Sequence, residues 1–353
     1  MPTQQQIDEQ YMQRALALAK HGLGSVAPNP MVGAVIVCGE KIIGEGFHRK
    51  CGGPHAEVNA IASVKEPGLL PLSTLYVTLE PCSHFGKTPP CADLIISKKI
   101  RRVVVGCQDP FKEVAGRGIK RLREAGIEVV IGCLECECRS LIRSFITFHT
   151  LQRPYILLKW AQSSDGFIDR WRDSVADGDP VKLSSKIAAF YVHQLRSQVD
   201  AIMVGTRTAL LDNPSLTTRL YSGKSPLRIA IDRAGKIPES SPLKDRSTDT
   251  LIFTEQVRES YGNLRYATLD FSTDIIPQLL SVLYKQNIQT LLVEGGAQLL
   301  RSFIENEQWD EVRVEKSSVL LGGGVQAPDF KSLPGKIVQA GTSSINYYFR
   351  KQA

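Results

Sequence analysis

The sequence predicts an α/β protein made of two consecutive domains, each a β-sheet packed between helices. Short strands rich in β-branched residues alternate with helical segments along the whole chain, and this alternation is typical of sheets covered by helices. The 353 residues exceed what a single hydrophobic core usually holds. The second half repeats the alternation in a pattern of its own, so an internal duplication is not indicated.

The first half is expected to begin with a helix, because Met12, Leu16 and Ala19 recur at helical spacing before a glycine. A β-branched hairpin with the turn CGEK comes next. The expected elements are, in order, a helix over 8–22, a hairpin over 31–48, a helix over 54–64, a strand over 73–81, a helix over 91–100, a strand over 101–110, a helix over 118–126 and a strand over 127–132.

A helical segment over 137–152 leads into Arg153-Pro154, where a new strand begins, so we place the domain boundary near residue 150. The predicted domains are residues 1–150 and 151–353. The expected elements of the second domain are strands over 155–161, 201–206, 227–232, 250–254, 290–296 and 311–317, with helices such as 185–198 and 275–286 between them.

The composition is that of an ordinary globular chain, with 42% hydrophobic and 22% charged residues. No apolar run approaches the roughly 20 residues that span a bilayer, and the N-terminal segment lacks an apolar signal core, so we expect a cytoplasmic protein. The net charge of +7 is scattered, without the basic tail or stripe of a nucleic-acid-binding protein. Such a surface suits an anionic small molecule such as a phosphate ester.

The cysteine content indicates metal binding or burial, because disulfides are rare in the cytoplasm. Cys133, Cys136 and Cys138 lie close together in the sequence. No histidine or fourth cysteine is near them, so we do not expect these three to form a metal site.

A candidate catalytic metal site combines His55 and Glu57 with two more distant thiols, Cys82 and Cys91. A hydrolytic zinc typically has three protein ligands and one water, whose pKa it lowers to about 7. A carboxylate beside that water can transfer its proton to a leaving amine. Because residue i+2 of a helix points away from residue i, Glu57 could reach the water only if His55 opens the helix. The preceding Gly52-Gly53-Pro54 favours such a start.

The order of these residues matches the zinc deaminase signature, H-x-E followed by P-C-x-x-C, with one departure. Eight residues separate Cys82 from Cys91 where the signature has two, so the insertion SHFGKTPP must loop outward if both thiols bind one metal. A lone H-x-E is commonly a coincidence. A structural zinc module would need four protein ligands, and a nucleoside or tRNA-base deaminase would require the shorter spacing.

In the second half, LLVEGGAQLL predicts a strand, a glutamate, two glycines and then a helix. The glycines allow a phosphate to approach closely, and the helix N-terminus provides free backbone donors. A second segment, GTRTALLDNPSLTTR, brings Arg207, Asp212 and Arg219 into one loop after a strand. No G-x-G-x-x-G follows a strand, so a Rossmann domain is disfavoured.

Four blocks of the first half resemble the bifunctional riboflavin-biosynthesis deaminase/reductase family: APNPMVGAVIV, GEGFHRKCGGPHAEV, YVTLEPCSHFGKTPPC and VVVGCQDPFKEVAGRGI. In the second half, YILLKWAQSSDG, LRSQVDAIMVGTRTALLDNPSLTTR and LLVEGGAQLL are similar to reductase blocks of that family. The resemblance spans essentially the whole chain and includes the long cysteine spacing. It implies a cytidine-deaminase-like three-layer α/β/α domain followed by a dihydrofolate-reductase-like α/β domain.

The resemblance implies an enzyme with two activities. The first domain would hold one Zn²⁺ and hydrolytically deaminate 2,5-diamino-6-(5-phosphoribosylamino)pyrimidin-4(3H)-one. The second would use NADPH to reduce the ribosyl side chain of the product to ribityl. The implied partners are this phosphorylated pyrimidine and, by analogy with the family, further copies of the chain in a homodimer or tetramer. Neither nucleic acid nor a membrane is implied.

Carried over position by position, the family's zinc ligands fall on His55, Cys82 and Cys91, and its proton shuttle falls on Glu57. The implied contacts with the deaminase substrate are Asn29, His48, His84 and Lys87. The implied contacts with NADPH are Ala161, Thr208, Asp212, Gly296, Ala297 and Gln298. The implied contacts with the reductase substrate are Lys159, Leu216, Arg219 and Glu294.

The second half departs from the family pattern at three places. The segment SSDG at 163–166 stands where the family usually has S-L-D-G, and EKSSVLLGG lacks the usual proline. DGDPVKLSS replaces the usual tryptophan segment, which affects the contacts expected near Pro180 and Lys182. This replacement favours one alternative, a zinc deaminase with a non-reducing C-terminal domain. A second alternative is that Asp212 and Arg219 form only a loop salt bridge.

Overall fold

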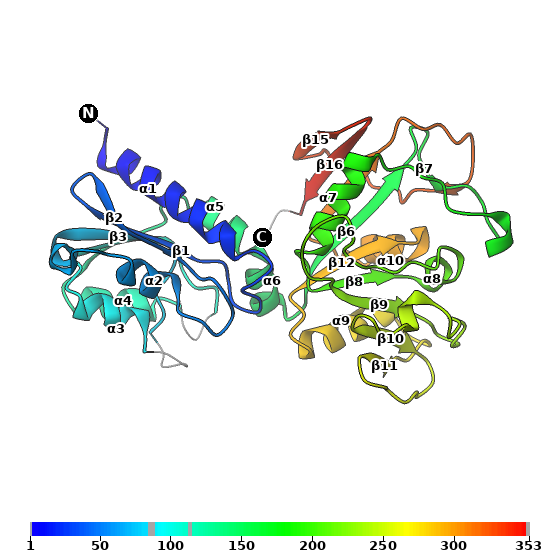
Figure 1. The fold of residues 1–353 in the computed structure, drawn as a ribbon, viewed down its shortest axis with the longest axis horizontal. Coiled ribbons are helices and arrows are strands. Elements are labelled where there is room, and N and C mark those ends of the chain that lie inside the picture. Colours follow the sequence, from blue (N-terminus) through cyan, green and yellow to red (C-terminus); the bar gives the residue numbers. More distant parts are fainter. Residues whose placement is uncertain (1, 84–88, 112–114, 351–353) are drawn as a thin grey trace. The chain divides into compact units, whose positions relative to one another are not determined.

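The computed structural model describes residues 2–83, 89–111 and 115–350. The chain divides into two compact units, Met1–Gln152 and Arg153–Ala353 (Figure 1). Among the described residues, no helix combines the length and the apolar character needed to cross a membrane.

The described part of the first unit contains a five-stranded sheet with the strand order β2-β1-β3-β4-β5. β1 is antiparallel to both of its neighbours, whereas β3, β4 and β5 are parallel. The elements are α1 (Gln4–Ala19), β1 (Gly33–Cys38), β2 (Lys41–Phe47), α2 (Ala56–Ala62), β3 (Ser73–Leu79), α3 (Cys91–Ser97), β4 (Arg102–Cys107), α4 (Arg117–Glu124), β5 (Glu128–Ile131), α5 (Glu135–Leu141) and α6 (Arg143–Leu151).

The sheet of the first unit has a hydrophobic core on each face, because successive strand residues point to opposite sides. Ala34 and Ile36 of β1 belong to the core that includes α2, α3 and α4. Val35 and Val37 belong to the core that includes α1, α5 and α6. The result is the predicted sandwich of helix, sheet and helix.

The segment 137–152, predicted to be helical, forms the end of α5 and all of α6. Ile142 separates them because its backbone leaves helical geometry, with φ −106° and ψ 21°. Its side chain is buried in the core, so tertiary packing overrides the local helical pattern.

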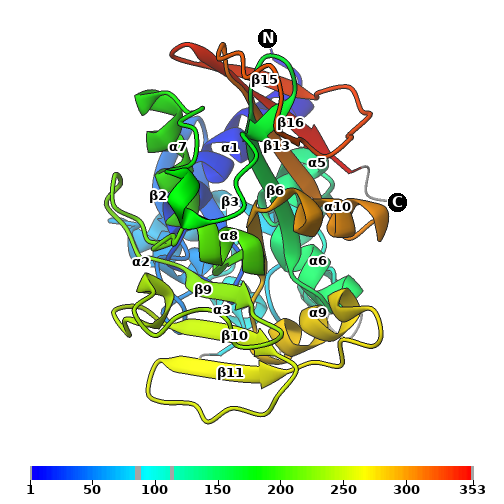
Figure 2. The same cartoon turned by 90° about the vertical axis from the view of Figure 1, so that its right-hand side faces the viewer.

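The described part of the second unit contains a nine-stranded sheet with the order β11-β10-β9-β8-β12-β6-β13-β16-β15. The strands from β11 to β13 are parallel, and β16 and β15 extend the sheet as an antiparallel hairpin. Figure 2 shows β9, β10 and β11 side by side at one end. The elements are β6 (Tyr155–Gln162), β7 (Phe167–Asp169), α7 (Lys186–Arg196), β8 (Ala201–Val204), α8 (Thr206–Leu211), β9 (Leu227–Ile231), β10 (Thr250–Thr254), β11 (Leu264–Thr268), α9 (Ile275–Lys285), β12 (Thr290–Gly295), α10 (Ala297–Glu305), β13 (Glu311–Lys316), β14 (Val325–Gln326), β15 (Lys336–Ala340) and β16 (Ser343–Phe349).

Helices cover both faces of the second sheet. The core on one face includes α9 and α10, and the core on the other face includes α7 and α8. Strands β7, β11, β14, β15 and β16 were not expected from the sequence. The parallel arrangement brings the carboxyl ends of β6, β8, β9 and β12 to one edge of the sheet, where ligands of open α/β sheets usually bind.

Candidate active sites

Three potential metal ligands converge in the first unit. His55 precedes α2, Cys82 follows β3, and Cys91 is the first residue of α3. The ligand atoms of the three residues all lie within 4.8 Å of one another. His55 Nδ1 is 3.6 Å from Cys82 Sγ and 3.3 Å from Cys91 Sγ. One imidazole and two thiols fit the three-ligand, open zinc sites found in hydrolytic enzymes.

The start of α2 places Glu57 next to this cluster. His55 is the N-cap residue, with extended backbone angles of φ −69° and ψ 166°, and Glu57 lies in the first helical turn. The expectation that His55 opens the helix is therefore confirmed. The Glu57 carboxyl group therefore lies beside the same three potential ligands as His55 does, although the two residues are only two positions apart.

The electrostatics of the cluster favour a thiolate beside a buried carboxyl group. Burial raises the pKa of Glu57 to about 7, and its side chain is only 3% exposed. A hydrogen bond from Cys91 lowers the pKa of the Cys82 thiol to about 4. The same contact, together with burial, raises the pKa of the Cys91 thiol. The Cys91 amide also donates to Cys82 Sγ at 3.3 Å.

Asn29 and His48 lie beside the metal ligands. The Asn29 side-chain amide is 3.0 Å from His48 Nε2, and His48 Nδ1 is 3.0 Å from the Pro54 carbonyl. The rings of His48 and His55 meet edge to face at 5.6 Å. Burial lowers the pKa of His48, which favours the neutral ring. In that form Nδ1 donates to Pro54, and Nε2 accepts from Asn29.

Glu80 is a buried acid that the sequence analysis did not single out. It lies between β3 and Cys82, and it is 5% exposed. Its carboxylate accepts backbone N–H groups at 2.9–3.3 Å from Asp109, Gly116, Gly118 and Ile119. The signal in the sequence was an acidic residue directly after a largely buried strand.

The second unit has a cleft of about 1310 Å³ at the carboxyl edge of its parallel strands. The cleft is lined by the ends of β6 and β12, by α8 and by the first turns of α10. The segment 169–173, which begins at the end of β7, also contributes to its wall. A dinucleotide fits in a space of this size.

The glycine pair at the end of β12 allows close approach of a ligand. Gly296 has φ +51°, and a Cβ there would lie 3.1 Å from Thr208 Oγ1. A Cβ at Gly295 would lie 3.1 Å from Thr208 Cγ2. Helix α10 begins directly after this turn with Gly296 as its N-cap, so no N-cap side chain covers its first backbone N–H groups and a phosphate can bind there.

Charged side chains form the inner part of the cleft. Glu294 is paired with Arg196, whose Nε and Nη2 donate to its two oxygens at 3.1 and 2.5 Å. Burial alone would raise the pKa of Glu294, but Arg196 holds it below its usual value. Lys159 Nζ lies 3.9 Å from the buried carboxylate of Glu315. Lys159 and Glu294 both line the cleft.

Two family models match the chain, one on each unit. The model of the cytidine and deoxycytidylate deaminase zinc-binding region matches residues 5–107, and the RibD C-terminal domain matches residues 154–342. The riboflavin biosynthesis protein RibD of Aquifex aeolicus is 40% identical, covering 92% of this chain and 90% of its own. The chain belongs to the RibD family.

Solved structures agree with this membership over the full length of RibD. A diaminohydroxyphosphoribosylaminopyrimidine deaminase/5-amino-6-(5-phosphoribosylamino)uracil reductase from Thermotoga maritima matches with a TM-score of 0.86 and 38% identity, covering 98% of this chain and 99% of that chain. Acinetobacter baumannii RibD matches with a TM-score of 0.86 and 31% identity, covering 99% and 100%. The predicted family and the predicted fold class of both domains are confirmed.

Most of the expected RibD reductase residues lie in one cleft. The residues that line it are Lys159, Ala161, Thr208, Asp212, Glu294, Gly296, Ala297 and Gln298. Leu216 is instead buried in the core beside α7 and α8, and Arg219 bonds to Ser215 and, through its amide, to His193. The roles of all these residues remain predictions. His84 and Lys87 lie outside the described residues.

Two arginines of the second unit were missed in the sequence. Arg196 links Glu294 to the carbonyl of Thr217 in the loop that carries Leu216 and Arg219. Arg172 pairs with Asp212, whereas Arg219 bonds to Ser215 and His193, so the alternative of a loop salt bridge between Asp212 and Arg219 is wrong. Both arginines come from segments that are distant in sequence from the acids they bind, and no local pattern could have indicated the pairing.

Proposed function

We propose that this RibD family member catalyses two successive steps of riboflavin biosynthesis with a small phosphorylated pyrimidine as substrate. The first unit hydrolyses the amine of 2,5-diamino-6-(5-phosphoribosylamino)pyrimidin-4(3H)-one and releases ammonia. The second unit reduces the ribosyl group of that product to ribityl with NADPH. The proposal rests on one observation above all: a His–Cys–Cys cluster beside a buried glutamate occurs in the same chain as a glycine-turn cleft.

In the deamination, His55, Cys82 and Cys91 would hold Zn²⁺, which supplies water activation at neutral pH. Glu57, in the first turn of α2, would take a proton from water and give it to the departing amine. Asn29 is held by His48 and can present its remaining amide groups to the pyrimidine edge. Water adds to the ring carbon, and the carbon–nitrogen bond breaks to give a carbonyl and ammonia.

In the reduction, the glycine turn before α10 would hold the cofactor phosphates, and NADPH supplies a hydride when it is bound. The hydride is added at the sugar C1 carbon, so one proton must be delivered to the same substrate. Lys159 faces the cleft from β6 and carries protons that it can donate. Glu294, fixed by Arg196, can accept hydrogen bonds from sugar hydroxyls.

The test measures ammonia release and NADPH oxidation together, with purified zinc-loaded protein, the diaminopyrimidine ribosyl phosphate and NADPH. We expect both signals, with NADPH oxidation lagging behind ammonia. Ammonia without oxidation would support the alternative of a non-reducing second unit. The absence of both signals would overturn the proposed substrate.

The first prediction concerns Glu57. E57Q should lower ammonia release by about 100-fold or more, because the amide cannot transfer protons. Bound zinc, measured by elemental analysis, should be retained, since none of the three ligands is changed. NADPH oxidation should disappear with the diamino substrate but return when the deaminated pyrimidine is supplied. E40Q, which alters an exposed side chain of the same unit, serves as the control. Deamination by E57Q at the control rate would refute the role of Glu57.

We also propose that the protein acts in the cytoplasm and assembles as a homodimer or homotetramer, as the family resemblance implies. Light scattering after gel filtration measures the assembly directly, and a monomeric mass at micromolar concentration would contradict it.

A further inference from the structure

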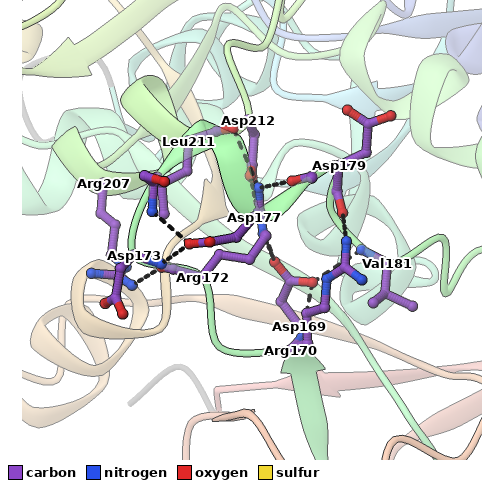
Figure 3. A network of polar contacts seen from close by, with 12 residues as sticks. Asp169, Arg170, Arg172, Asp173, Asp177, Asp179, Val181, Arg207, Leu211 and Asp212 are labelled. Atoms are coloured by element: carbon purple, nitrogen blue, oxygen red, sulfur yellow. Dashed lines mark hydrogen bonds and ion pairs between the residues drawn. The ribbon is translucent and has the colours of Figure 1, made fainter.

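We propose that Arg172 is a positioning residue for the cofactor half of the second cleft. It holds the segment 169–181, called the clamp segment here, against α8. This inference rests on the proposed reductase function. Figure 3 shows the network in which Arg172 lies between carboxylates from two different parts of the chain.

Arg172 is unusually buried for an arginine near a cleft, with 4% exposure. Its Nε donates to Asp169 Oδ2 at 2.8 Å, and its Nη2 pairs with Asp212. Its Nη1 donates to the carbonyls of Gly178 and Leu211, each at 3.3 Å. The guanidinium therefore joins both ends of the clamp segment to the last turn of α8.

The clamp segment is ordered further by bonds within itself. Asp169 Oδ1 also accepts a hydrogen bond from the Val181 amide at 3.0 Å. The Asp169 carboxylate therefore joins Arg172 to the last residue of the segment. Arg207 of α8 lies over the Trp171 ring, with 4.9 Å from Cζ to the ring centre, and donates to the Arg172 carbonyl. α8 and the clamp segment thus contact each other through side chains of both partners (Figure 3).

Helix α8 connects this network to the glycine turn. The Thr208 side chain packs against both glycines, because a Cβ at Gly295 or Gly296 would lie 3.1 Å from it. One turn later, the Asp212 amide donates to the Thr208 carbonyl at 3.0 Å. Asp169 and Asp212 would otherwise place two carboxylates in a cleft that must accept phosphates. Arg172 offsets this charge and fixes the position of Asp212, one of the residues expected to contact NADPH.

The test compares three variants by their KM for NADPH, with the deaminated pyrimidine at saturation. R172Q should raise this KM by about tenfold or more, because two unpaired carboxylates then face the cofactor. R172K should also raise it, since an ammonium keeps the charge but cannot bridge both acids with fixed geometry. R233Q is the control, because Arg233 belongs to the same unit and loses the same charge, but its guanidinium pairs with Glu255 outside the residues that line the cleft.

A merely structural role would lower kcat and thermal stability together, whereas positioning should change KM with kcat little affected. Ammonia release by the same samples reports on the first unit. If R172Q does not fold, D169N is measured instead and should also raise KM. If the unaltered chain oxidises NADPH, equal KM values for the Arg172 and Arg233 variants would overturn the inference. No oxidation by the unaltered chain would overturn the proposed function itself.

Discussion

At the scale of single residues, a buried acid beside Cys82 supports the candidate metal site. Glu80 immediately precedes Pro81-Cys82, and its two oxygens accept four backbone N–H groups from the segment 109–119. Gly118 packs so closely that a Cβ there would lie 1.9 Å from the Pro81 carbonyl. Glu80 therefore fixes the turn that presents Cys82.

We expect E80Q to destabilise the first unit by roughly 2–4 kcal/mol, because the side-chain amide cannot accept all four bonds and leaves buried donors unpaired. Zinc retention during dialysis should fall as well. Urea unfolding followed by circular dichroism measures the first effect, and elemental analysis measures the second. E66Q, an exposed acid of the same unit, is the matched control. An E80Q protein as stable as this control would show that the bonds are dispensable.

At the scale of secondary-structure elements, the close packing of α2 on β2 positions two chemical groups at once. α2 carries Glu57 in its first turn, and His55 caps its start. Gly46 of β2 lies against this helix, and a Cβ there would be 2.3 Å from the Ala60 nitrogen and 2.5 Å from the Ala56 carbonyl oxygen. The helix can approach the sheet only because this strand residue has no side chain.

We expect G46A to push α2 away from the sheet, at a cost of about 1–3 kcal/mol from overpacking. Zinc content and ammonia release should both decrease, since His55 and Glu57 move with the helix. G68A is the control, because a Cβ at Gly68 would have no atom within 4 Å. Thermal unfolding and zinc analysis of the two variants provide the comparison. Full zinc content in G46A would mean that the helix does not need this contact.

Much of this element structure was predictable, and its limits have a physical cause. The alternation of strands and helices, the helix opened by His55 and the glycine turn before α10 follow local patterns that depend on near neighbours. The break at Ile142 and the hairpin of β15 and β16 were missed. Both depend on packing against distant parts of the chain, which no local pattern records.

At the scale of the whole molecule, each unit has hydrophobic cores of its own among the residues that the structure describes. Two large clusters consist of residues from the first unit, and two others consist of residues from the second. The residues expected to hold zinc all lie in the first unit, and the residues expected to contact NADPH all lie in the second. Ligand binding should therefore stabilise one unit at a time.

We expect calorimetry to show two unfolding transitions. Removal of zinc with a chelator should lower the temperature of one transition, and NADPH should raise the temperature of the other, by mass action on the folded state. Bovine serum albumin under the same buffer conditions controls for effects of the additives. A single transition that responds to both ligands would show that the units unfold as one.

The sequence by itself determined the chemistry of this protein: the donor atoms for a metal, the glutamate beside them and the glycine turn are residue types in a recognisable order. Only the tertiary structure decided which charges meet. Arg196 reaches Glu294 across 98 residues, and Arg172 reaches Asp212 across 40. Such pairs form because the fold brings the carboxyl ends of its strands to one edge, where a cation from a distant segment offsets the cost of burying an acid.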